Sequence, residues 1–274
     1  MDGASVGTDC RLVRARRRSL RTAHVVSACI GWGVRLPALL QNIARPPRST
    51  GVEPFDTRYR GFYPGEVVVL AHDDRETARL LACDVAAGMA AYQMPVGHNQ
   101  VFWGHLESRW TPAAYDVELR ARAPEHHSWI VAEDLTGIHV RELVKKTESW
   151  ARGARCPGLV IVEELEGLRG AHHDVARLMK TMALREPQLA VLLLSFCPKA
   201  EGPTIADYDA VGEAVDFLVW FQAPTRRHLG QLSLLGHTDL AHVEVRKARS
   251  AATCSAFAMD SPVSRLPRPA PRAG

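Results

Sequence analysis

Short apolar runs alternate with amphipathic segments between residues 66 and 222 of the chain. Most runs are continuously apolar, which is typical of strands buried on both faces of a parallel sheet. Several intervening segments repeat apolar residues every three or four positions, as amphipathic helices do. The predicted strands are 67–71, 100–106, 129–132, 159–162, 190–195 and 217–221, and the predicted helices are 75–92, 140–152 and 173–184. This alternation predicts an α/β fold with a mostly parallel central sheet flanked by helices.

Two further patterns flank this alternation. Residues 242–245 and 255–259 predict a C-terminal β-hairpin. Before the first strand, a short amphipathic helix is predicted at about 35–44, and Arg45-Pro46-Pro47 ends it. Its apolar stripe consists of Leu36, Leu39, Leu40 and Ile43. We expect this stripe to cover either its own domain or a neighbouring subunit.

Charge separates the chain into three parts. Residues 1–48 hold nine Arg and two Asp, giving +7, and residues 261–274 hold three Arg and no acid, giving +3. Because the whole chain carries +4, residues 49–260 carry −6. We therefore predict a mildly acidic domain at 49–260 between a basic, largely disordered N-terminus and a disordered Pro- and Arg-rich tail. An acidic domain does not favour a surface for duplex DNA, whereas the Arg-rich N-terminus could contact nucleic acid.

The cysteines and apolar runs bear on compartment and metal binding. The six cysteines are scattered without a CxxC pair, so no zinc motif is present and a reduced, cytoplasmic protein is expected. No apolar run is long enough to span a membrane. Residues 23–34 lack a convincing cleavage site for a signal peptide, so we expect no export. The sequence predicts no metal site.

Polar residues follow the predicted strands, and ligands of open α/β sheets bind at these strand ends. The segment from Thr50-Gly51 through Phe55-Asp56 to Gly61-Phe-Tyr-Pro-Gly-Glu66 leads into the first strand. Glu107 follows the second strand, Glu163 follows strand 159–162, and a K-x-R element stands at Lys247 and Arg249. Further matching segments are 128–143, 191–195 and 212–220.

In this order and spacing, the motifs resemble the C-terminal, RecA-like ATPase domain of DnaB-family replicative helicases of superfamily 4, over about residues 50–260. The resemblance implies a RecA-like P-loop-NTPase-type fold. It implies that Glu107 is a general base and that Glu163 stands at the Walker B aspartate position. It also implies that Lys247 and Arg249 reach the nucleotide of a neighbouring subunit.

The phosphate-binding loop departs from the family pattern. A P-loop uses glycines to expose backbone N–H groups, a lysine for charge and a hydroxyl for magnesium. Here the loop is His72-Asp-Asp-Arg-Glu-Thr-Ala-Arg79, and no glycine occurs between Gly65 and Gly88. The Gly-Lys-(Ser/Thr) triplet falls on Thr77-Ala78-Arg79, so the Walker A motif is degenerate. We expect Asp74 to cap the following helix where a phosphate would bind, which leaves Arg75, Thr77 and Arg79 as the candidate nucleotide contacts.

Acidic residues gather around the same loop and in the segment after strand 190–195. Asp73, Asp74, Glu107, Glu163 and Glu164 could hold a divalent cation, but pairing with arginine or solvation is the expected outcome. In the family, the segment after this strand contacts DNA. Here residues 198–214 carry four acids (Glu201, Asp207, Asp209 and Glu213) against Lys199, which opposes contact with phosphates.

Three functions follow from these features. The leading one is a non-hydrolysing binding or scaffolding subunit for DNA replication or a related DNA transaction, with no cofactor. Its partners would be a second copy of itself or a RecA-like ATPase to which it lends Arg249. The alternative is an active ATP-dependent helicase with an atypical phosphate loop, using ATP and Mg²⁺. The third is a DNA-associated protein anchored through its Arg-rich N-terminus, and none of the three involves a membrane.

Overall fold

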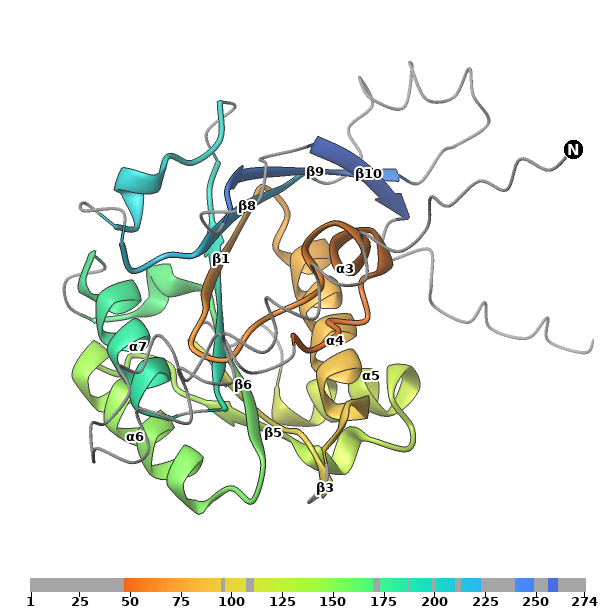
Figure 1. Cartoon of the computed structure of the whole chain (residues 1–274). Helices are drawn as coiled ribbons and strands as arrows, with labels where there is room; N and C mark the ends of the chain where they lie inside the picture. Colours follow the sequence, from red (N-terminus) through yellow and green to blue (C-terminus); the bar gives the residue numbers. More distant parts are fainter. Residues whose placement is uncertain are drawn as a thin grey trace, which may run out of the picture. The chain divides into compact units, whose positions relative to one another are not determined.

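The predicted strands form one eight-stranded sheet in the order β10-β9-β8-β1-β7-β6-β4-β5. The computed structural model describes residues 47–94, 97–106, 111–169, 173–186, 188–198, 201–209, 213–222, 240–248 and 256–260 (Figure 1). The predicted helix at 35–44 lies outside these residues. The strands of the sheet are β1 (Val67–His72), β4 (Gln100–His105), β5 (Ile130–Asp134), β6 (Pro157–Glu163), β7 (Ala190–Phe196), β8 (Phe217–Gln222), β9 (Leu240–Lys247) and β10 (Ala256–Asp260). A small separate hairpin pairs β2 (Gln93–Met94) with β3 (Gly97–His98).

The pairing of the strands confirms the predicted sheet. Strands β8, β1, β7, β6, β4 and β5 are parallel to one another. Strand β9 runs antiparallel to both β8 and β10, as the predicted C-terminal hairpin requires. Strand β10 therefore points the same way as β1, and its last residue lies at the carboxyl edge of the sheet. In open α/β sheets this edge carries the ligand site.

Five helices accompany the sheet in the described part of the chain. They are α3 (Glu53–Tyr59), α4 (Arg75–Ala91), α5 (Pro112–Arg122), α6 (Val140–Gly153) and α7 (His173–Arg185). The predicted helices correspond to α4, α6 and α7, whereas α3 and α5 were not predicted. Helix α5 begins with a common start signal, because Thr111 caps it and Pro112 occupies its first turn. Among the described residues, no helix has both the length and the apolar character needed to cross a membrane.

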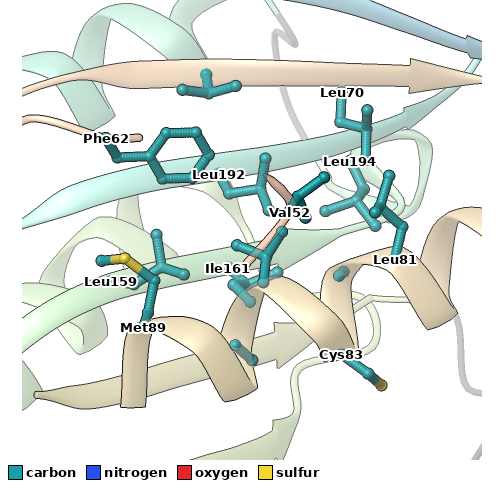
Figure 2. Close-up of a cluster of buried hydrophobic side chains, with 14 of the residues drawn as sticks. Val52, Phe62, Leu70, Leu81, Cys83, Met89, Leu159, Ile161, Leu192 and Leu194 are labelled. Atoms are coloured by element: carbon teal, nitrogen blue, oxygen red, sulfur yellow. The ribbon is translucent and has the colours of Figure 1, made fainter. Parts of the chain in front are cut away.

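Alternate residues of the strands enter two separate cores. Val68 and Leu70 of β1 face α3, α4 and α5, whereas Val67 and Val69 face α6 and α7. Figure 2 shows the first core, where Leu81 and Met89 of α4 point toward strands β1, β6 and β7. Burial on both faces explains why these strands are continuously apolar in sequence.

Gly88 allows α4 to lie directly against the segment that precedes α3. A Cβ atom at this position would lie 2.6 Å from the backbone nitrogen of Gly51, so backbone would have to move. We expect Gly88→Ala to lower the free energy of unfolding by about 1–3 kcal/mol, despite the better helix propensity of alanine. Urea denaturation measures the change. The control is Gly153→Ala in α6, where a Cβ meets nothing within 4 Å and stability should stay the same or rise. Equal effects of the two changes would contradict this account.

Candidate functional site

The connection between β1 and α4 consists of two residues, Asp73 and Asp74. Asp74 is the N-cap of α4 and its side chain accepts a hydrogen bond from the backbone N–H of Thr77 at 3.2 Å, which confirms the predicted cap. The Thr77 hydroxyl also donates to this carboxylate. A phosphate at a helix N-terminus would need these same donors. The carboxylate of Asp74 therefore occupies the position where an anionic ligand is otherwise bound.

Behind this connection, Arg79 of α4 forms a buried ion pair with Glu163 at the end of β6. Arg79 contacts one carboxylate oxygen, Oε1. The second oxygen, Oε2, accepts a hydrogen bond from Trp103 Nε1 at 3.1 Å and another from the Tyr115 hydroxyl. Strand β4 supplies Trp103 and α5 supplies Tyr115. Both oxygens of Glu163 are thus engaged by protein donors in a site closed to solvent.

The charges of this network compensate each other. Burial is the largest single effect on Arg79 and disfavours its charged form, but attraction by Glu163, Tyr115 and Glu164, together with the hydrogen bond to Glu163, raises the pKa of Arg79 above its ordinary value. Burial, together with the Glu163 charge, also raises the pKa of Tyr115, so the phenol stays protonated and acts as a donor. A buried pair of this kind persists because its hydrogen bonds are satisfied on all sides. The network therefore has the character of a structural ion pair.

A second ion pair lies beside the first. Arg75, in the first turn of α4, places Nε 3.2 Å from Glu164 Oε2, and its guanidinium lies 4.6 Å from the ring centre of Phe196. Glu164 is buried and has a left-handed backbone with φ of 60°, which is uncommon for a residue other than glycine. Burial raises its pKa from 4.5 to about 7, against the opposing attraction of Arg75. The expected pairing of the acidic residues with arginine is confirmed for Glu163 and Glu164.

Two buried histidines line the same strand ends. His72 closes β1 with its Nε2 3.9 Å from Glu164, and burial lowers its pKa to about 3. His105 closes β4, stacks on Tyr115 with ring centres 4.9 Å apart, and also has a pKa lowered by burial. Both rings are therefore neutral near pH 7. Within the described residues, no three His, Cys, Asp or Glu side chains are placed to hold a metal ion.

The structure brings together only some of the predicted site residues. Arg75, Thr77, Arg79 and Glu163 meet at the β1–α4 connection. Lys247 ends β9 and pairs with Leu218, near the start of β8. His72 pairs with Phe221, near the end of β8. The position of Lys247 therefore separates it from the Arg79–Glu163 pair within one chain. Glu107 and Arg249 lie outside the described residues.

Sequence reasoning missed the two aromatic donors to Glu163. Trp103 lies inside a predicted strand, where the apolar pattern indicates only a core position. In the structure it pairs with Ile161, two residues before Glu163. Tyr115 belongs to α5, which was not predicted. Thr111-Pro112 is the signal that could have identified that helix.

The fold has counterparts among solved structures, although no family model and no curated protein matches the sequence. The ATPase domain of one DnaB-like helicase is 15% identical, with a TM-score of 0.58 over 80% of this chain and 90% of that one. A DnaB-like replicative helicase, described with its interactions with primase, is 14% identical, with a TM-score of 0.59 over 89% of this chain and 73% of that one. This chain therefore has the RecA-like α/β fold of the ATPase domains of DnaB-like helicases.

Proposed function

We propose that this chain is a RecA-fold subunit that neither binds nor hydrolyses ATP and works by binding other protein subunits. It would act in the cytoplasm in DNA replication or a related DNA transaction, in a homo-oligomer or beside an active RecA-like ATPase. The DnaB-like helicase with the same fold supports this setting, since that protein is described as replicative and as interacting with primase.

One observation carries the non-hydrolysing part of the proposal, namely the closed Arg79–Glu163 pair. A working phosphate site needs a free carboxylate for magnesium and a hydroxyl from the start of the helix. Here the carboxylate of Glu163 is held by Arg79, Trp103 and Tyr115, and Thr77 donates to Asp74. Binding Mg-ATP would require breaking this network and expelling the Asp74 cap. Both changes oppose nucleotide affinity.

Calorimetry with the full chain tests this proposal. We expect no heat of binding when Mg-ATP or Mg-ADP is titrated to millimolar concentration, which corresponds to a binding free energy weaker than about −4 kcal/mol. Parallel measurement of the mass in solution gives the oligomeric state. Micromolar binding of either nucleotide would overturn the proposal.

The alternative is an active ATPase with an atypical phosphate loop. It is favoured by Glu163 at the end of β6 and by Lys247 on β9, since both residues stand where the resemblance expects catalytic groups. Under this alternative, Glu107→Gln abolishes ATP hydrolysis, and DNA raises the rate of ATP hydrolysis by the native chain. The second measurement after calorimetry is therefore phosphate release with and without single-stranded DNA.

Lending Arg249 to a partner's ATPase site is a separate part of the proposal. If Arg249 reaches the nucleotide of an active partner, Arg249→Ala lowers the partner's ATP turnover without preventing complex formation. An unchanged turnover would leave the chain only a scaffolding role.

DNA binding through residues 1–22, which contain six of the nine N-terminal arginines, is tested by deleting them. Binding that is unaffected, with the same salt dependence, would exclude this contact.

A further inference from the structure

A pocket of about 190 Å³ opens at the carboxyl end of β7, beside the site already described. Its walls combine two aromatic rings with two carboxylates and a hydroxyl: Phe196, Tyr208, Glu166, Asp207 and Ser195. We name it the β7 pocket. Neither Arg79 nor Glu163 lines it.

Hydrogen bonds in the β7 pocket run toward Glu166. Tyr208 donates to Ser195 Oγ at 3.1 Å, and Ser195 donates to Glu166 Oε1 at 2.5 Å. Glu166 is exposed, and no cationic side chain in the described part of the chain forms an ion pair with it. The pocket therefore presents negative charge and hydrogen-bond acceptors, and it repels phosphate.

These walls suit a guanidinium group. Arginine stacks its planar head on aromatic rings and donates in pairs to carboxylates. Phe196 accepts such a contact elsewhere in the structure, because Arg75, which does not line the pocket, places its guanidinium 4.6 Å from the ring centre. Carboxylates within reach add a charge-assisted hydrogen bond.

The segment 261–274 supplies such a group. It carries Arg265, Arg268 and Arg272 and no acid. It follows β10, which is parallel to β1 and ends at the same edge of the sheet as β7. Four strand spacings of about 4.8 Å, on the order of 19 Å, separate β10 from β7. The eight residues from Asp260 to Arg268 span up to about 28 Å when extended, which exceeds this separation.

We propose that the β7 pocket binds Arg268 of the same chain. Tethering raises the local concentration of the arginine to the millimolar range, and stacking on the aromatic rings adds to its attraction by the carboxylates. This contact involves no nucleotide, so it stands or falls separately from the proposed lack of ATP binding.

Zero-length cross-linking of the full chain tests the proposal. Arg268→Lys introduces the only lysine of segment 261–274, and a carbodiimide joins lysine to a carboxylate only when the two are in contact. Mass spectrometry is expected to find the side chain at position 268 of this variant joined to Glu166 or Asp207. The additional change Glu166→Gln keeps the acceptor for Ser195 but removes the charge, and should lower the total yield at least fivefold.

Two outcomes would overturn the proposal. One is the absence of any link from position 268 to Glu166 or Asp207. The other outcome is a link between two different chains. To detect it, ¹⁵N-labelled and unlabelled chains are mixed before cross-linking. Links that join labelled to unlabelled peptides at the frequency expected for random pairing would identify a second copy as the occupant. Links confined to one isotope at a time support binding within the chain.

Discussion

Glu163→Gln is expected to lower the free energy of unfolding by about 3–5 kcal/mol, because it leaves Arg79 buried without a compensating charge. Glutamine keeps one oxygen as an acceptor for Trp103 and Tyr115, but its NH2 group replaces the oxygen that accepts from Arg79, so the change removes both the charge and this acceptor. Urea denaturation at pH 7 measures the loss. An active site would behave differently, since a carboxylate there serves a metal ion and its removal affects turnover more than folding.

Two control variants separate the buried pair from general effects of mutation. Combining Glu163→Gln with Arg79→Met removes both charges and is expected to recover much of the lost stability, since apolar replacement of a buried ion pair is often neutral. Glu133→Gln breaks the half-exposed pair with Lys146 and should cost no more than about 1 kcal/mol. A loss below about 1 kcal/mol for Glu163→Gln would show that Arg79 and Glu163 are not a structural pair.

The sheet could be predicted from the sequence, whereas part of the site could not, for physical reasons. The strands are buried on both faces, so their apolar runs stand out from the helical segments. The Asp74 cap depends on neighbours three residues away and was predicted from local sequence alone. The donors to Glu163 were not, because Trp103 and Tyr115 lie 60 and 48 residues away and their contact depends on tertiary packing.

Helix α5 illustrates the same limit. Its only described buried side chains are Tyr115 and Leu119, so it lacks the long apolar stripe that identifies α4 and α6. A start signal at Thr111 is then the only local indication. Yet this helix supplies the phenol that helps to close the candidate nucleotide site. A helix without a long apolar stripe thus contributes a central part of the site.

Glu164→Gln is expected to stabilise the chain above pH 7 and to have little effect below pH 4.5. In the folded chain Glu164 contacts His72 of β1 and Arg75 of α4, and the charges of Glu163 and Glu166 also act on it. The pKa of Glu164 is raised from 4.5 to about 7, with burial as the largest cause and the two neighbouring carboxylates adding to it. The folded state therefore holds a proton that the unfolded chain has already released. Folding loses this advantage as the pH rises from 4.5 to 7.

The size of the effect follows from the same pKa values. A tenfold change in proton affinity corresponds to about 1.4 kcal/mol, so ionising Glu164 destabilises the fold by on the order of 3 kcal/mol at pH 8. Glutamine cannot ionise, and the stability difference between Glu164→Gln and the native chain should grow between pH 4.5 and 7 and then level off. Urea denaturation of both chains from pH 4 to 8 measures this difference, in which all other titrating groups cancel. If the difference is constant with pH, or if glutamine destabilises the chain at pH 8, then attraction by Arg75 outweighs burial and the raised pKa is wrong. A difference that grows as described would show that ionisation of Glu164 destabilises the folded chain. The packing of β1, α4 and β6 around Glu164 then outweighs this cost.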